Sequence, residues 1–252
     1  MIRMRFETRT KLVLAALLLL SGCGRLIPEA PKPTPYYPPS MSRPGQTSYA
    51  AATGVIGQPI DGDTWRRLRG ATSSLGQCVA ELDAARVTFS PTPDRVNSET
   101  CGLTDAGVLG PDFGTVARMQ PSDLTMTCAL AAAVSVWRRQ SVEPAARELF
   151  GSDVVQIDHM GVYACRPVNS QAGNRPSAHS RAAALDFAGV RLRDGTRITV
   201  TNDWNDPGPK GQFLHRIRDD ACKVFGTTLS PDYNALHHDH LHLEAEASRF
   251  CR

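Results

Sequence analysis

The sequence lacks an apolar run long enough to cross a membrane. Its N-terminal apolar run, residues 12–20, has nine residues, whereas a helix needs about 20 to span a bilayer core of about 30 Å. A retained transmembrane helix is therefore not expected. Four basic residues precede the run, and Ser21, Gly22 and Cys23 follow it. A basic segment, a short apolar segment and small residues in this order predict a signal peptide over residues 1–22.

The residues Leu-Ser-Gly-Cys that end at Cys23 resemble the cleavage box of bacterial lipoproteins. This resemblance implies that Cys23 carries the lipid and that the chain is anchored on the periplasmic face of the cell envelope. The alternative is an ordinary signal peptide with a chance cysteine. Gly24 stands where an aspartate is associated with retention in the inner membrane, so the outer membrane is the expected location.

Large aliphatic residues are scarce after the first positions of residues 24–50, which contain seven prolines. Such a segment cannot form a packed core, and we expect residues 23–55 to be a semi-extended tether. At about 3.1 Å per residue, roughly twenty residues would hold the rest of the chain on the order of 60 Å from the lipid. Residues 56–252 are then predicted to form one domain.

An excess of basic charge is also missing. Removing residues 1–22 takes four basic residues from 28 and one acidic residue from 25, which leaves 24 of each. The mature chain is about neutral, and no basic surface for nucleic acid is expected. The membrane contact is expected through the lipid alone, and the oligomeric state is left open.

No pair of cysteines has the C-x-x-C spacing of a thiol-ligated metal site. Six cysteines remain besides Cys23, and an even number in an exported chain predicts up to three disulfides. Pairing cannot be read from sequence, although short loops favour Cys78–Cys101 and Cys222–Cys251 and leave Cys128 for Cys165. The alternative is that some of these cysteines are free and buried.

No internal repeat and no regular alternation of strands and helices is present, which argues against a parallel α/β sheet. The patterns predict helices at 75–85, 129–147 and 213–225 and strands at 87–89, near 108, and at 124–128, 154–157, 162–165, 185–192, 197–200 and 241–244. Residues 158–161 are predicted to be a hairpin turn with a solvated His159, and Pro144 leaves two shorter helices equally open. The fold class expected is α+β, with a mostly antiparallel sheet flanked by helices.

Chemistry-bearing residues gather in two places, His179 with Asp186 and His240 with His242. On one strand, His240 and His242 would point to the same face, because side chains alternate. Asp186 stands among apolar neighbours, where a carboxylate requires a cation or a donor. Two histidines and one aspartate are ligands of the kind that a catalytic zinc accepts, with a fourth position left for water.

Three motifs resemble zinc peptidases of the lysostaphin, D-alanyl-D-alanine metallopeptidase and sonic hedgehog type. They are residues 161–166 (GVYACR), Ser177-x-His179-x6-Asp186 and residues 239–242 (DHLH). More of the chain, nearly all of residues 75–252, resembles the bacterial extensin-like C-terminal domain, including residues 231–234 (PDYN) and the final Cys-Arg. The resemblance implies a hedgehog-like or D-Ala-D-Ala-peptidase-like fold and a Zn²⁺ held by His179, Asp186 and His242.

The resemblance also implies roles for further residues. His240 resembles the catalytic histidine, and Asp239 occupies the position of the acidic base in the wall carboxypeptidases, so both stay open, with His240 preferred. Arg166 and Ser177 resemble substrate-binding residues, although Arg166 could form a surface ion pair and Ser177 could cap a backbone group. Ala182 stands where these peptidases commonly have glycine.

The function expected from this resemblance is a zinc peptidase that acts on peptidoglycan stem peptides or cross-links. A metal-bound water near neutral pKa would attack the scissile carbonyl. The alternative is a non-catalytic module that binds or supports the cell wall and retains the fold. The sequence does not identify the bond that is cleaved.

Overall fold

The computed structural model describes residues 54–245 and 249–252. The predicted signal peptide, the lipidation site Cys23 and the tether as far as residue 53 lie outside these described residues. No helix within the described ranges combines the length and the apolar character that a membrane crossing requires.

A central sheet carries the fold, and most of its pairs are antiparallel. The strand order is β12-β10-β11-β8-β7-β5, with β9 paired to β8, and only the β10–β12 and β5–β7 pairs are parallel. The strands are β5 (Arg118–Gln120), β7 (Val154–Gly161), β8 (Ala184–Leu192), β9 (Arg197–Thr199), β10 (Thr227–Leu229), β11 (Leu241–Glu244) and β12 (Phe250–Cys251). Together with the helices, this sheet confirms the predicted α+β class.

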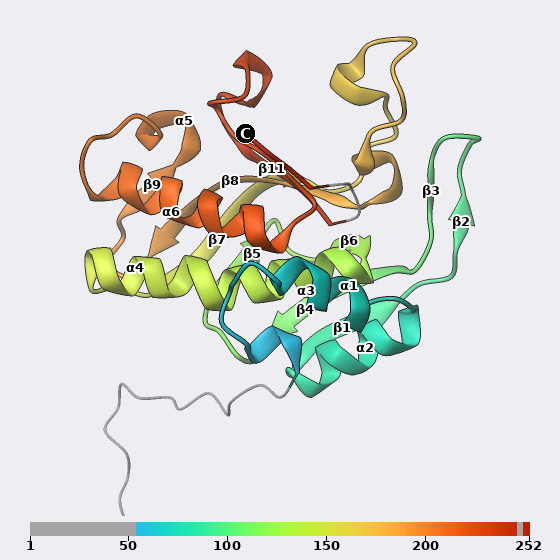
Figure 1. The fold of residues 1–252 in the computed structure, drawn as a ribbon, viewed down its shortest axis with the longest axis horizontal. Helices are drawn as coiled ribbons and strands as arrows, with labels where there is room; N and C mark the ends of the chain where they lie inside the picture. Colours follow the sequence, from blue (N-terminus) through green and yellow to red (C-terminus); the bar gives the residue numbers. More distant parts are fainter. Residues whose placement is uncertain (1–53, 246–248) are drawn as a thin grey trace, which may run out of the picture. The chain divides into compact units, whose positions relative to one another are not determined.

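Helices cover one face of this sheet (Figure 1). The α-helices are α1 (Thr64–Ala71), α2 (Leu75–Ala84), α3 (Cys128–Trp137), α4 (Glu143–Phe150), α5 (Val200–Asp203) and α6 (Pro209–Val224). Trp137 lies fully buried at the centre, with its ring edge-on to Phe187 of β8 and its Nε1 donating to the carbonyl of Ile217 in α6. Because side chains alternate along β8, burying Phe187 against the helices turns Asp186 to the other face.

A smaller antiparallel sheet packs beside the helices in the order β1-β4-β6, and a two-stranded ribbon, β2-β3, extends from it (Figure 1). These strands are β1 (Val87–Pro91), β4 (Ala106–Asp112), β6 (Leu124–Thr127), β2 (Arg95–Val96) and β3 (Gly102–Leu103). Short 3-10 turns are η1 (Val55–Gly57), η3 (Val168–Ser170), η4 (Ala178–Arg181) and η5 (Ala235–His237). The turn η4 leads into β8, so His179 lies shortly before the start of that strand.

The predicted hairpin over residues 154–165 is wrong. A single strand, β7, continues to Gly161, because Asp158 and His159 pair with β8 and bulges absorb the irregular register. His159 is buried, not solvated, and its Nε2 donates to the carbonyl of Pro121 over 2.8 Å. Residues 162–165 then leave the sheet toward the β2-β3 ribbon instead of returning along β7.

Pro144 does not break the helical path that begins at Cys128. A π-helical segment, η2 (Arg138–Val142), joins α3 to α4, and Pro144 falls in the first turn of α4. A proline is tolerated there because the first N–H groups of a helix have no partner within it. Gly151 ends α4 with a φ of 62°, the left-handed conformation that favours glycine at a helix end.

Three disulfides link the six cysteines, but two of the predicted pairings are wrong. The bonds are Cys78–Cys128, Cys101–Cys165 and Cys222–Cys251. The predicted pair Cys78–Cys101 favoured a short loop and left Cys128 for Cys165, whereas the folded chain brings α2 beside α3 and the ribbon beside residue 165. Of the three predicted pairs, Cys222–Cys251 is confirmed.

A buried glutamate gives the fold a pH-dependent stability. Burial raises the pKa of Glu143 from its ordinary value of 4.5 to about 7, so the unfolded chain releases this proton more readily than the folded chain. As the pH rises from about 4.5 to about 7, the free energy of unfolding of the wild type should therefore fall, by on the order of 3 kcal/mol relative to Glu143→Gln. Urea unfolding of both proteins at pH 4.5 and 8 measures this difference, and equal pH dependence would contradict it.

Candidate metal centre and cleft

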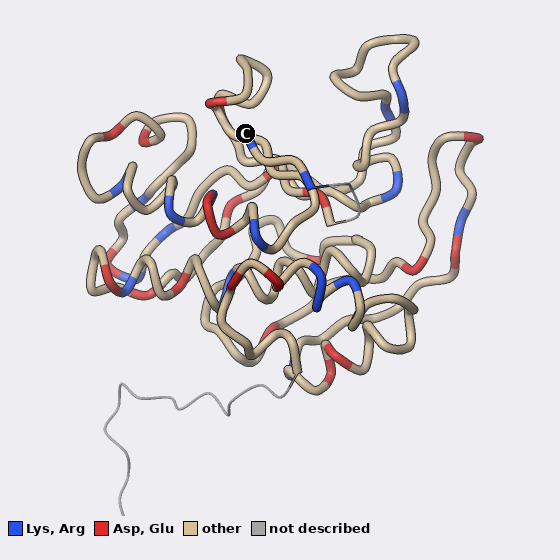
Figure 2. Tube along the Cα trace, viewed as in Figure 1, with Lys and Arg blue, Asp and Glu red and all other residues tan. Residues whose placement is uncertain are grey.

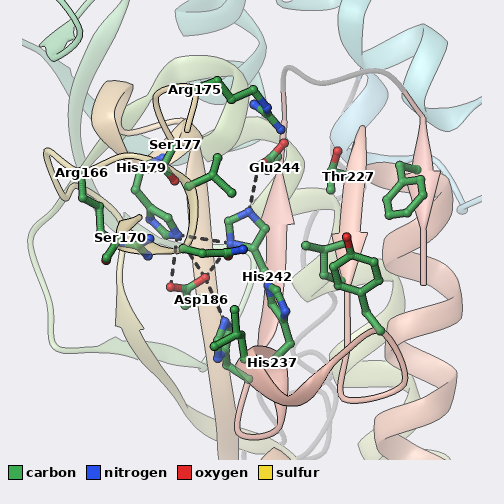
Figure 3. A pocket seen from close by; sticks show the side chains of 17 residues that line it. Arg166, Ser170, Arg175, Ser177, His179, Asp186, Thr227, His237, His242 and Glu244 are labelled. Atoms are coloured by element: carbon green, nitrogen blue, oxygen red, sulfur yellow. Dashed lines mark hydrogen bonds and ion pairs between the residues drawn. The ribbon is translucent and has the colours of Figure 1, made fainter. Parts of the chain in front are cut away.

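Three predicted ligands meet on the face of the sheet opposite the helices (Figure 3). Asp186 in β8 and His242 in β11 are direct cross-strand partners, and His179 in η4 lies just before β8. His179 Nε2 is 3.2 Å from Asp186 Oδ1 and 3.2 Å from His242 Nδ1, and His242 Nδ1 is 2.8 Å from Asp186 Oδ1. Within the described residues, these three form the cluster of His, Cys, Asp and Glu that could hold a metal ion.

Hydrogen bonds to the outer ring nitrogens of His179 and His242 leave the nitrogens that face the cluster able to bind a metal. His179 Nδ1 donates to the carbonyl of Val162 over 2.7 Å, and His242 Nε2 donates to Glu244 Oε1 over 2.9 Å. Each hydrogen bond fixes one proton on the outer nitrogen, so that His179 Nε2 and His242 Nδ1 can offer lone pairs. Zinc bonds of about 2.0–2.1 Å in a tetrahedron place ligand atoms about 3.3 Å apart, so the donor set and its spacing fit zinc.

Glu244 is a residue of the site that the sequence interpretation missed. It lies two positions after His242 on β11, it is buried, and it accepts the outer N–H of His242. Burial alone would raise the pKa of Glu244, but hydrogen bonds with His242 and Thr227, together with the positive charges of His242 and Arg175, lower it below its usual value. The signal was present, because the run HLHLE at 240–244 places every second residue on one face.

The carboxylates of Asp186 and Glu244 control the charge of the candidate metal centre. Burial would raise the pKa of Asp186, but hydrogen bonds with His179 and His242 lower it well below its usual range. Burial would likewise lower the pKa of His242, yet Asp186 and Glu244 together raise it to about 9. The centre therefore favours positive charge between the two carboxylates, and a proton on Nδ1 must leave before that nitrogen binds a metal.

We expect Glu244→Gln to weaken metal binding about 10- to 100-fold, because a neutral amide accepts the His242 proton less strongly than a carboxylate. Chelator competition on the purified protein measures the affinity. Glu148→Gln is the matched control, since Glu148 is exposed and pairs with Arg216. Equal affinities for both variants would show that Glu244 does not support the ligand.

His240 and Asp239 form a hydrogen-bonded pair, and His240 is the member of the pair that approaches the metal ligand Asp186. Asp239 Oδ1 lies 2.8 Å from His240 Nδ1, and His240 Nε2 lies 3.6 Å from Asp186 Oδ1. This hydrogen bond lowers the pKa of Asp239. His240 lines the cavity above the metal ligands, whereas Asp239 contacts it from behind. His240 directly precedes β11 and shares the face of His242, as alternation predicts.

A cavity of about 610 Å³ opens over the three ligands. One wall is the loop after β7, whose residues 162–183 include three arginines and no acidic residue (Figure 2). Arg166 and Ser177 both line the cavity, and the guanidinium of Arg166 forms no ion pair with any described residue. Ser177 Oγ accepts the backbone N–H of His179 over 3.3 Å, so this hydroxyl caps η4 and faces the cleft at once.

The comparison with protein families gives a match to the family described as extensin-like protein C-terminus, over residues 76–252. The chain belongs to this family. No curated protein and no solved structure matches it. The extensin-like part of the predicted resemblance is therefore confirmed.

Two further residues of this extensin-like domain line the cavity, and the sequence interpretation assigned neither of them a role. His237 is buried, with its ring 5.2 Å from that of His240, and its Nδ1 donates to Asn234 Oδ1 over 2.8 Å. Burial, together with the neighbouring imidazoles, lowers the pKa of His237 to about 4. Arg175 lies on the loop opposite, near Glu244 (Figure 3). Neither His237 nor Arg175 belongs to a sequence pattern from which its place in the cavity could be predicted.

Ala182, where the resembling peptidases commonly carry glycine, lies outside the cavity lining in this extensin-like domain. It is fully buried and has a φ of 54°, and its carbonyl accepts the N–H of Thr127 over 2.9 Å. This left-handed conformation costs an alanine about 1–2 kcal/mol. The turn at Ala182 therefore costs folding free energy, and it joins η4 to β8 so that His179 lies beside Asp186.

Proposed function

We propose that this extensin-like domain is a zinc-dependent peptidase that cleaves peptidoglycan stem peptides or cross-links. One observation carries the proposal: His179 Nε2, His242 Nδ1 and Asp186 Oδ1 converge within 2.8–3.2 Å, while each outer imidazole nitrogen is held by a hydrogen-bond acceptor. A buried carboxylate between two such histidines has the ligands of a catalytic zinc, with room for a further ligand on the side of the cavity.

The chemistry that zinc supplies in such a site is polarisation of the scissile carbonyl and a bound water whose pKa falls toward about 7. The residues of the chain supply the remaining functions. Asp186, His179 and His242 would hold the ion, and Glu244 would keep His242 in the ligating tautomer. The relation to zinc peptidases of the lysostaphin and hedgehog type is part of this proposal.

We assign the proton transfers to His240, with Asp239 as the group that orients it. His240 presents Nε2 toward the ligand cluster while Nδ1 is held by Asp239 over 2.8 Å. An imidazole fixed in this way can accept a proton from the attacking water and return it to the leaving amine. Asp239 as the direct base is the weaker assignment, because its carboxylate is already engaged with His240.

Arg166 supports the choice of a peptide with a carboxylate as substrate. Its guanidinium lines the cavity and has no ion-pair partner among the described residues. Guanidinium donors can hold a carboxylate through two parallel hydrogen bonds. Ser177, whose hydroxyl also caps η4, would add a donor to the substrate backbone.

We further propose that the domain works in the periplasm, where a lipid on Cys23 anchors it and the proline-rich tether holds it away from the membrane. Its three disulfides support an oxidising compartment. The tether would place the cleft within reach of a wall layer away from the membrane.

The test uses the purified mature domain, beside His240→Ala and the control His238→Ala. Metal content is measured first, and soluble fragments of purified peptidoglycan are then incubated with each protein and analysed by mass spectrometry. We expect one zinc per chain in all three proteins and cleavage that falls about 100-fold or more in His240→Ala alone. A folded wild type that takes up zinc but cleaves no fragment would leave a non-catalytic wall-binding module.

A further inference from the structure

The outer part of the loop after β7, residues 163–176, has few links to the other described elements of the fold. Its backbone pairs within the loop, because the Val168 N–H donates to the carbonyl of Arg175 over 2.9 Å and the Ser177 N–H donates to that of Arg166 over 3.1 Å. This outer loop carries Arg166 and Arg175 into the lining of the cavity. Its position over the metal ligands therefore depends on what joins it to the rest of the chain.

Two side-chain links join the outer loop to the β2-β3 ribbon, and both segments project from the body of the domain (Figure 1). Cys165 is bonded to Cys101, which is buried and directly precedes β3, and Asn97 Nδ2 donates to Tyr163 Oη over 2.6 Å. Cys165 is also the residue before Arg166. The covalent link therefore fixes the backbone next to the guanidinium that lines the cavity.

The tip of the outer loop has a backbone conformation that its residues do not prefer. Asn169 and Ser170 are consecutive, and their φ values are 57° and 54°. The left-handed conformation is unfavourable for residues other than glycine, although less so for asparagine, and it persists only where the surrounding structure imposes it. If the link to the ribbon is opened, the tip should therefore relax away from this shape.

The link to the ribbon differs from the other two disulfides of the described chain in its access to solvent. Cys165 is exposed, whereas Cys78 and Cys128 each keep 1% of their surface accessible, and Cys222 and Cys251 are half-buried. A disulfide is reduced when a thiolate attacks one of its sulfurs, so access to a cysteine favours the reaction. A thiol in solution should therefore reduce the Cys101–Cys165 bond first.

The surroundings of this disulfide also favour the thiolates that reduction produces. The Thr100 hydroxyl lies 3.8 Å from Cys101 Sγ, close enough to donate to sulfur. Residues 162–183, which include Cys165, contain three arginines and no acidic residue. A hydroxyl donor and nearby positive charge both stabilise a thiolate, so this disulfide should open more readily than one in a neutral apolar setting.

Resting on the proposed peptidase function, we propose that the Cys101–Cys165 disulfide is a redox-sensitive link that positions Arg166, and that a protein dithiol opens it to weaken substrate binding. A thiolate of the dithiol attacks Cys165 Sγ, and Cys101 leaves as a thiolate that takes up a proton. The second thiol of the dithiol then displaces Cys165, so the chain gains two electrons and two protons while the dithiol becomes a disulfide. The metal should stay bound, because the outer loop contains none of its three ligands.

Differential alkylation of the zinc-loaded mature chain tests which disulfide opens. Under graded dithiothreitol, Cys101 and Cys165 should become labelled at a concentration about tenfold lower than the other four cysteines, as mass spectrometry of the peptides measures. Hydrogen exchange at the amides of Val168 and Ser177 should then rise about tenfold or more, with zinc content unchanged. Equal reduction of all three disulfides, or unchanged exchange after selective reduction, would overturn the link.

The double variant Cys101→Ser/Cys165→Ser tests whether the link positions the substrate. Its KM for a peptidoglycan fragment that wild type cleaves should rise about tenfold with kcat nearly unchanged, since a released wall must be ordered again on binding. Dithiothreitol at the selective concentration should have no further effect on this variant. Asn97→Ala is the matched control, because it breaks the hydrogen bond to Tyr163 alone and should leave KM nearly unchanged.

The outcomes separate this link from the proposed function. If the double variant fails to fold, selectively reduced and alkylated wild type gives the same kinetic measurement. A wild-type KM in the unlinked protein would refute the positioning role while the peptidase remains. If wild type cleaves no fragment, the proposed function fails and the control of substrate binding fails with it, whereas reduction and exchange still decide whether the link holds the outer loop.

Discussion

Replacing His242 by alanine should remove the metal and all cleavage together. His242 Nδ1 lies 2.8 Å from Asp186 and 3.2 Å from His179 Nε2, so its loss leaves two of three protein ligands. Losing the hydrogen-bond partner of a ligand already costs about 10- to 100-fold in affinity, and losing the ligand itself should cost at least about 100-fold. Zinc content after dialysis against a weak chelator, followed by the peptidoglycan cleavage assay, measures both effects.

His238→Ala is the matched control for that result. The side chain of His238 is 70% exposed, its Nδ1 donates to the carbonyl of Ala235, and its Nε2 lies 3.9 Å from Asp239 Oδ2. An exposed ion pair at this distance contributes little, so the loss of His238 should leave metal content and cleavage unchanged. Removing His242 also leaves Asp186 and Glu244 without their shared partner, and near-ultraviolet circular dichroism checks that the variant is folded. A folded His242→Ala protein with a full complement of zinc would contradict the ligand assignment.

The candidate metal centre was largely predictable because its residues follow a local rule. Side chains alternate along a strand, so His242 and Glu244 share one face of β11, and His240, directly before the strand, continues the same alternation. Asp186 among apolar neighbours indicated a buried charge that needs a cation. The meeting of Asp186 with His242 depends on the register of β8 against β11, which no local pattern specifies, and the resemblance to zinc peptidases supplied it instead.

The errors arose where distant segments decide the structure. Asp158 and His159 have the composition of a turn, but pairing with β8 along the whole of β7 keeps them extended. The disulfides followed the same principle, since Cys78 is bonded to Cys128 across a separation of 50 residues and Cys101 to Cys165 across 64. Short loops favour closure only weakly, and helix packing decides which cysteines come together.

A buried ionic cluster lay outside anything that periodicity could predict. Asp112, at the end of β4, accepts hydrogen bonds from Arg138 and Arg139 and from the N–H of Gly114 over 2.8 Å. All three charged side chains are almost inaccessible to solvent. Consecutive arginines in a helix usually point in different directions, and here they lie in the π-helical segment η2. The cluster joins the smaller sheet to the helical layer.

Asp112→Ala should therefore be the most destabilising of the substitutions considered, by about 3–5 kcal/mol, because it leaves two buried guanidinium groups without their counter-charge. Asp63→Ala removes an exposed ion pair with Arg66 and should cost about 0–1 kcal/mol. Urea unfolding with the disulfides intact measures both values. Because the cluster shares no residue with the metal centre, Asp112→Ala should still bind zinc while folded. Equal stability of the two variants would show that Arg138 and Arg139 reach water or another acceptor when Asp112 is lost.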